Sequence, residues 1–206
     1  MSTRIARHRG KSIRTGLLVV GALALAGLGI STAAADTTPP AASSPESAQE
    51  VQQTLAQYVR GTDHRDGAAV SGLFTSKGAV EILAKNSNGA YKPVASPIVG
   101  RDAINNAVTH MQAPLTGLAS EHHVTSDPTV SVKGHTAHLN VQFITYAVQG
   151  ASEPAGGWPA GTAGAQGTIK PYESGYYDAE LRRVDGDWQI TNLRILHDLP
   201  IIIPSS

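Results

Sequence analysis

Hydrophobic residues recur along this chain with two different periods, which divide it into predicted helices and strands. The first helical segment carries one apolar stripe, formed by Val51, Leu55, Tyr58 and Val59. The sequence Ser-Ala-Gln-Glu that begins at Ser47 fits a capping box, so we expect the helix to begin there. Gly61 is typical of a helix end.

Two further helices are predicted before the chain changes period. Asp66 can cap a short helix in which Val70, Leu73 and Phe74 share a face. A third helix is expected over 100–111, and Pro114 blocks its continuation.

Alternation with a period of two indicates the strands. It begins in 79–84, where the turn-forming sequence Lys-Asn-Ser-Asn-Gly leads to a partner at 91–99. Longer alternating segments follow at 121–132, 136–148 and 172–199, and a turn at 184–187 splits the last into a hairpin. Helices followed by antiparallel strands predict an α+β domain.

The N-terminal segment differs from the rest of the chain. Five Lys and Arg residues precede an apolar run of 14 residues at 17–30, and small residues follow at 33–35. A membrane-spanning helix needs about 20 apolar residues, so we interpret 1–35 as a signal peptide, with an uncleaved anchor as the alternative. Residues 36–45 then form a proline-rich linker, and 46–206 form the domain. The predicted location is outside the cell or in its envelope.

The charge and the cysteine content limit which partners the domain can bind and what stabilises it. The whole chain is neutral, but without residues 1–35 it has 11 Lys and Arg against 16 Asp and Glu, and it has no cysteine. An acidic domain disfavours nucleic acid and anionic membranes as partners, and we expect no stable membrane insertion after signal removal. Stability must come from a packed core rather than from disulfides.

Four segments together resemble the SnoaL-like branch of the nuclear transport factor 2 (NTF2-like) superfamily. They begin at Tyr58, Gly100, His122 and Gly175, and the resemblance covers about 46–200. It implies a cone in which a curved antiparallel sheet packs against three helices around a pocket, and relatives often form homodimers through the outer face of the sheet. Relatives include polyketide cyclases, ketosteroid isomerase and scytalone dehydratase. The general base of the isomerase would fall on Ile82, which cannot accept a proton, so that mechanism is not supported.

His123 is the predicted proton carrier of the pocket. The resemblance places a histidine at the start of this strand, and the imidazole of histidine exchanges protons near neutral pH. Strand alternation sends His122 to the opposite face, toward solvent. Asp178 is expected to orient His123, and Tyr58, at a position where the isomerase has an oxyanion donor, is expected to bind the substrate oxygen. Each of these residues also has a purely structural interpretation, as a surface or core residue.

The remaining candidates are substrate-binding residues. Asp63 lies in a helix connection where capping alone could explain it, and Trp158 lies in a Gly- and Pro-rich loop at 150–171 that is either a lid or an insert. The other candidates are His122, Tyr146, Tyr176 and Tyr177. No metal site is expected, because His135 and His138 fall on opposite faces of a strand and cysteine is absent.

These features predict an exported protein that binds a small apolar molecule, with cofactor-free acid-base chemistry such as dehydration, isomerisation or cyclisation. Two alternatives remain open at this stage. One is a non-catalytic binding or dimerisation module, and the other is a carrier of hydrophobic metabolites.

Overall fold

The structure is a computed structural model that describes residues 44–110, 115 and 117–201. All of them belong to one unit of the chain, residues 38–206. The predicted signal peptide and residues 36–43 of the predicted linker lie outside the described residues. Within the described ranges, no helix combines the length and the apolar character that a membrane crossing requires.

Helix α1 (Pro45–Asp63) is longer than the sequence pattern predicts at both ends. Its N-cap is Ser44, whose side chain accepts a hydrogen bond from the Ser47 amide, and proline fits the first helical position because its missing N–H would be unpaired there anyway. The predicted capping box at Ser47 is therefore wrong. Gly61 does not end the helix either: a Cβ atom there would lie 2.6 Å from Val70 Cγ2, so this glycine allows close packing between helices.

The two shorter helices lie where they were predicted, except for the end of the first. Helix α2 (Gly67–Gly72) begins at the N-cap Asp66, whose Oδ1 accepts a hydrogen bond of 2.9 Å from the Ala69 amide. It ends at Gly72, so that Leu73 is its C-cap and Phe74 already belongs to the first strand. Helix α3 (Arg101–His110) buries Ile104 and Ala107.

The strands form one seven-stranded sheet in the described part of the chain. They are β1 (Phe74–Lys85), β2 (Tyr91–Pro93), β3 (Ile98–Val99), β4 (Ala119–Lys133), β5 (Thr136–Gly150), β6 (Gly167–Val184) and β7 (Asp187–His197). Their order is β2-β1-β7-β6-β5-β4, with β3 also pairing with β1. All pairs are antiparallel except β1 with β7, which is parallel and joins the first strand to the last. The predicted α+β fold is confirmed.

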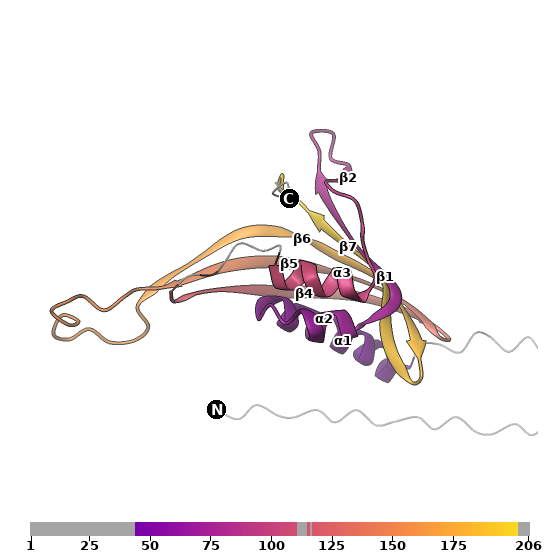
Figure 1. The fold of residues 1–206 in the computed structure, drawn as a ribbon, viewed down its shortest axis with the longest axis horizontal. Coiled ribbons are helices and arrows are strands. Elements are labelled where there is room, and N and C mark those ends of the chain that lie inside the picture. The colour runs from indigo at the N-terminus through magenta and orange to yellow at the C-terminus, as the bar shows by residue number, and fades with distance from the viewer. Residues whose placement is uncertain (1–43, 111–114, 116, 202–206) are drawn as a thin grey trace, which may run out of the picture. The chain divides into compact units, whose positions relative to one another are not determined.

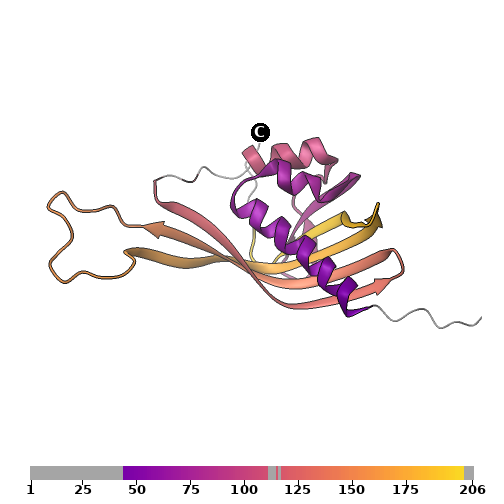
Figure 2. The ribbon, with the colours of Figure 1, turned by 90° about the horizontal axis from the view of Figure 1, so that it is seen from below.

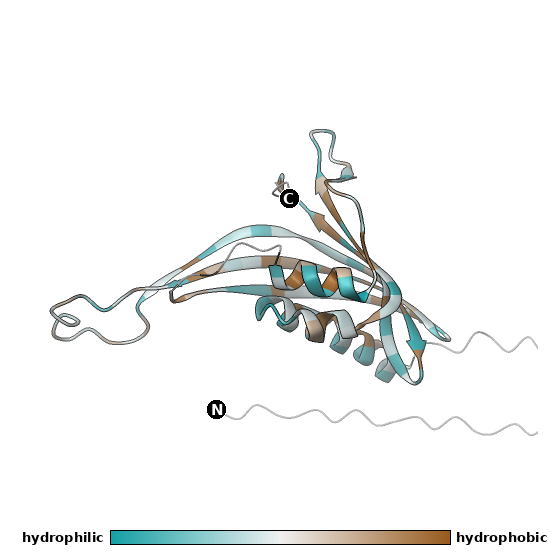
Figure 3. Cartoon of the chain, viewed as in Figure 1, coloured by the Kyte–Doolittle hydropathy of each residue, from teal (hydrophilic) through white to brown (hydrophobic). Residues whose placement is uncertain are grey.

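The helices lie on one face of this curved sheet (Figures 1 and 2). Helix α1 contacts β4, β5 and β7, whereas α2 packs on α3 and α3 on β1. We call the face of the sheet toward α1 the inner face and the opposite face the outer face. Hydrophobic and hydrophilic positions alternate along the strands, as expected for a sheet with one covered face (Figure 3).

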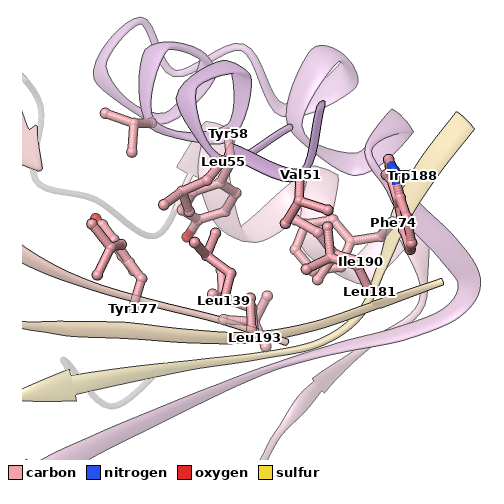
Figure 4. Close-up of a cluster of buried hydrophobic side chains, with 14 of the residues drawn as sticks. Val51, Leu55, Tyr58, Phe74, Leu139, Tyr177, Leu181, Trp188, Ile190 and Leu193 are labelled. Carbon is pink, nitrogen blue, oxygen red and sulfur yellow. The ribbon is translucent and has the colours of Figure 1, made fainter. Parts of the chain in front are cut away.

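The core lies between α1 and the inner face. Leu55 and Tyr58 of α1 meet Leu139 of β5, Tyr177 of β6 and Leu193 of β7, and all five are buried (Figure 4). Burying large apolar side chains of this kind contributes about 1.5–3 kcal/mol each. The core therefore fixes α1 against the middle of the sheet, and with it the position of the helix end at Asp63.

The Gly- and Pro-rich loop, with no regular structure between 151 and 166, lies at the tip of the β5–β6 hairpin. The Ala151 amide donates to the carbonyl oxygen of Gln166, so the hairpin ladder closes at the base of the loop. The loop extends beyond the sheet, away from the helices (Figures 1 and 2), and Trp158 is 38% exposed. Of the two alternatives for this loop, the structure does not show a lid over the inner face.

Candidate functional site

Asp63, the last residue of α1, binds His123 of β4 twice. Its Oδ1 atom lies 2.6 Å from the ring atom Nδ1 and also accepts a hydrogen bond of 3.1 Å from the backbone amide of His123. The two side chains are only 13% and 10% exposed. The carboxylate therefore fixes both the backbone and the ring of this histidine.

This contact determines which ring nitrogen of His123 can react. An ionised carboxylate only accepts hydrogen bonds, so Nδ1 carries the proton that is donated to Asp63. In the neutral ring, Nε2 then keeps its lone pair and can accept a proton. This is the tautomer that a general base requires.

His123, Thr145 and Glu173 form a row across three strands of the inner face. In the register of the sheet, His123 lies opposite Thr145 of β5, and Thr145 lies opposite Glu173 of β6. Thr145 is fully buried. Its hydroxyl interacts with the carboxyl group of Glu173 and lowers the pKa of that group, so the two groups lie near one another.

The charges in this row interact with one another. Burial raises the pKa of Glu173, and the positive charge of His123 partly offsets this increase. His197 of β7 lies 3.9 Å from Glu173, measured from Nδ1 to Oε2. Burial, assisted by the charge of His123, lowers the pKa of His197 to about 4. The row therefore contains a carboxyl group whose pKa is raised and a histidine whose pKa is lowered.

A bulge in β6 adds a tyrosine to the site. The register between β5 and β6 shifts between Thr145 and Tyr146, which leaves Tyr172 unpaired next to Glu173. Burial raises the pKa of Tyr172, and the nearby carboxylates of Glu121 and Glu173 raise it further. Tyr172 is exposed and Glu173 is partly exposed, so solvent reaches this end of the row.

Tyr58, Phe143 and Tyr177 form an aromatic layer beneath the row. The rings of Phe143 and Tyr177 stack with their centroids 4.5 Å apart, and Tyr58 meets Tyr177 edge to face at 5.7 Å. Burial raises the pKa of Tyr58 to about 12 and that of Tyr177 well above its ordinary value. Both tyrosines are therefore neutral core residues that fill the cone below His123.

The predicted partnership of Asp178 with His123 is wrong. Asp178 is next to Tyr177 in β6, and because neighbours along a strand point to opposite faces, its side chain lies on the outer face. There it lies 2.5 Å from His138 Nε2 and also pairs with Arg194. Asp63 orients His123 instead.

The other predicted residues also divide between the two faces. Tyr177 and Asp63 lie on the inner side with His123, as described above. His122 is exposed and lies opposite Tyr146, and both fall on the outer face, as does Tyr176, because each is adjacent to an inward residue. The predicted separation of His122 from His123 is confirmed, whereas Tyr146, Tyr176 and Trp158 do not line this site.

A groove of about 620 Å³ lies elsewhere on the domain and contains none of the predicted site residues. It runs between α1 and the β6–β7 turn and is lined mainly by polar side chains, among them Gln53, Gln57 and Gln189. Glu50 at this groove accepts a hydrogen bond from the Trp188 indole and pairs with Arg183. These contacts stabilise the hairpin, and the groove brings no acid-base pair together.

Metal ligation has no support among the described residues, in which no three His, Asp or Glu side chains come close enough to hold an ion. The acid-base groups that sequence reasoning missed are Glu173, His197 and Glu121. Glu121 precedes His123 by two positions, so strand alternation alone could have placed it beside that histidine. The positions of Glu173 and His197 beside His123 depend on the register between strands, which no local pattern reveals.

Several solved structures share this fold. The β subunit proposed for an aromatic-ring-hydroxylating dioxygenase from Novosphingobium aromaticivorans has a TM-score of 0.56 and 12% identity, covering 76% of this chain and 92% of its own. ActVI-ORFA from Streptomyces coelicolor has a TM-score of 0.54 and 15% identity, and the match covers 73% of this chain and 96% of that protein. A Nostoc punctiforme protein of unknown function with a cystatin-like fold has a TM-score of 0.53 and 13% identity, and the match covers 75% of this chain and 93% of that protein. At these identities the similarity shows the fold alone.

Sequence comparison gives the family. No curated protein matches this chain. The model of the SnoaL-like domain, however, matches residues 44–194, nearly all of the described structure. The chain therefore belongs to the SnoaL-like domain family of the NTF2-like superfamily.

Proposed function

We propose that this protein binds a small, uncharged organic molecule at the His123 row and removes a proton from it without a cofactor. The observation that carries the proposal is the 2.6 Å contact between His123 Nδ1 and Asp63 Oδ1, which leaves Nε2 as the proton acceptor. A carboxylate behind the ring also stabilises the imidazolium that forms when the proton arrives. The reaction class is proton removal next to a carbonyl group, which begins a dehydration, an isomerisation or a cyclisation.

The surroundings of His123 favour an uncharged ligand. Asp63, Glu121 and Glu173 all lie at this end of the inner face, and the charges of Glu121 and Asp63 both reach Tyr172. Carboxylates this close to one another would repel an anionic ligand. The rings of Phe143 and Tyr177 lie next to His123, with centroids 6.2 and 6.4 Å from its ring, and offer apolar contact.

Deuterium exchange tests this proposal directly. The domain is incubated in D2O with a panel of small cyclic ketones, and exchange at the carbon next to the carbonyl is followed by NMR. We expect the wild-type domain to accelerate exchange of at least one ketone and His123→Gln to abolish the acceleration. His122→Gln is the matched control, because it changes the neighbouring histidine on the outer face, and it should retain full activity. Equal exchange by wild type and His123→Gln would contradict the proposal.

A second candidate function, a non-catalytic binding module, is favoured by one observation. Tyr58, Phe143 and Tyr177 pack against one another and fill the cone beneath His123, so the ligand would lie over the row rather than in an enclosed cavity. In that case a ketone would shift the NMR signals of the His123 ring without any exchange of its own protons. Export of the protein, predicted from residues 1–35, remains part of the proposal and would be tested by sequencing the N-terminus of secreted protein.

A further inference from the structure

We propose that Glu173 is the second proton-transferring group of the site and gives a proton to the ligand as His123 accepts one. This inference rests on the proposed function, because it assigns His123 as the base. It concerns a residue that the sequence pattern did not identify. It also makes the site bifunctional, with one group that removes a proton and another that supplies one.

The register of the sheet places the two groups for this task. His123 and Glu173 lie on the inner face, two strands apart, with Thr145 between them. Adjacent strands are about 4.8 Å apart, so the two backbones are separated by about 10 Å. Side chains that project from both sides of this interval can contact opposite edges of one small ring.

Thr145 lies between the two groups in the register of the sheet. Its side chain is fully buried, and its hydroxyl interacts with the carboxyl group of Glu173 and lowers the pKa of that group. The row is therefore continuous from His123 through Thr145 to Glu173.

The surroundings of Glu173 suit a proton donor. The carboxyl group is 27% exposed, and His197, 3.9 Å away, is neutral near pH 7, so it does not hold Glu173 in its ionised form. Five groups face Glu173: Tyr172 next to it in β6, Thr145 in β5, Glu121 and His123 in β4, and His197 in β7. Burial and the nearby carboxylate of Glu121 both favour the protonated form, whereas only His123 and Thr145 oppose it.

Benzisoxazole, a small neutral aromatic molecule, is a suitable probe because its ring opening requires both steps. The C3–H bond breaks and its proton goes to His123 Nε2, while the electron pair forms the third carbon–nitrogen bond. The N–O bond breaks, and the released oxygen takes the proton of Glu173. The product is 2-cyanophenol, and proton transfer from His123 back to Glu173 restores the starting state.

The experiment compares benzisoxazole with 5-nitrobenzisoxazole, whose phenoxide is a much better leaving group and needs little help from an acid. We expect His123→Gln to lose at least about 100-fold in rate on both probes, the usual contribution of a general base. Glu173→Gln should slow the ring opening of benzisoxazole at least about tenfold, and it should slow the ring opening of 5-nitrobenzisoxazole less than about twofold. Glu180→Gln is the matched control, because it changes an exposed carboxylate on the outer face of the same strand, and it should leave the rates on both probes unchanged.

The outcomes separate the two proposals. If His123→Gln is as active as the wild type, or if the wild type opens neither probe, the proposed base is wrong and the role of Glu173 falls with it. A different result arises if His123→Gln is inactive but Glu173→Gln slows the opening of both probes equally or not at all. The assignment of His123 as the base is then kept, and the proton-donor role of Glu173 is overturned. A direct titration of the Glu173 carboxyl by ¹³C NMR gives a readout without any substrate. Its pKa should rise in His123→Gln and stay unchanged in His122→Gln.

Discussion

Asp63 ends the first helix and His123 lies in an edge strand 60 positions later, yet one carboxylate binds both the backbone amide and the ring of that histidine. The helix core around Leu55 and Tyr58 fixes the position of Asp63, and the sheet fixes the position of His123. The orientation of the base is therefore a product of the packing of α1 on the sheet.

Replacing Asp63 by asparagine should reverse the tautomer of His123. The asparagine oxygen can still accept from the backbone amide, but its NH2 group would donate to Nδ1, so the ring proton would move to Nε2. Nitrogen-15 NMR of the ring distinguishes the two tautomers. Asp66→Asn is the control, because asparagine is an equally good N-cap and should leave the His123 signals unchanged. An unchanged tautomer in Asp63→Asn would show that Asp63 does not determine it.

Asp178→Ala should leave the site intact. Its partners His138 and Arg194 are about half exposed, so we expect a loss of no more than about 1 kcal/mol in the free energy of unfolding. The ring signals of His123 should not move, since Asp178 lies on the outer face. A shift of these signals comparable to that in Asp63→Asn would restore Asp178 as a partner of the histidine.

The free energy of unfolding of the domain should fall in acid, because His197 must then take up a proton. Its folded pKa of about 4 lies below the ordinary value of 6.5, so the unfolded chain binds a proton at this residue first. The stability that depends on neutral His197 is complete above pH 6.5 and is lost as the pH falls toward 4. The expected loss at about pH 4.5 is about 2–3 kcal/mol.

Urea unfolding at neutral pH and at about pH 4.5 measures this loss. His197→Gln should show a smaller decrease than the wild type by that amount, and His122→Gln, which changes an exposed histidine, should behave like the wild type. Both comparisons retain Glu173, so its opposite dependence on pH largely cancels. Identical decreases in wild type and His197→Gln would contradict the prediction.

The sequence predicts the elements well because their signals are local. Alternation correctly separates His122 from His123. It could not tell which of the two faces α1 covers, since a period of two is the same on both. The expected partnership of Asp178 with His123 fails for this reason, because the core contacts of Tyr177 place Asp178 on the outer face.

The partners of His123 could not be predicted because they depend on distant segments. Asp63 reaches the histidine only once α1 has packed, and capping explained the same aspartate equally well from the sequence. Alternation from Tyr177 places Glu173 on the inner face, but its position beside Thr145 and His123 depends on the register between β5 and β6. That register joins segments that are distant in the sequence, so a local pattern cannot pair this carboxylate with the histidine.

Tyr58 should prove to be a core residue. Tyr58→Phe keeps the ring contacts with Phe74 and Tyr177, so it should cost about 1 kcal/mol or less. Tyr58→Ala removes a buried ring and should cost about 3–5 kcal/mol. Thermal and urea unfolding measure both values. If Tyr58→Phe instead slowed the opening of 5-nitrobenzisoxazole by tenfold while remaining fully stable, the hydroxyl would act on the ligand as the family resemblance suggests.

The 151–166 loop should be dispensable for both folding and the site. The Ala151 amide bonds to Gln166 at 3.0 Å, so the intervening residues can be replaced by Asn-Gly, the sequence preferred in a two-residue hairpin turn. Loop length has a weak effect on closure entropy, so the free energy of unfolding should change by less than about 1 kcal/mol. The ring signals of His123 and the rate on 5-nitrobenzisoxazole should match those of the wild type, because the loop extends away from α1. Trp158→Ala in the intact loop is the matched control. A loss of turnover in the shortened chain, reproduced by Trp158→Ala, would show instead that the loop folds over the ligand during the reaction.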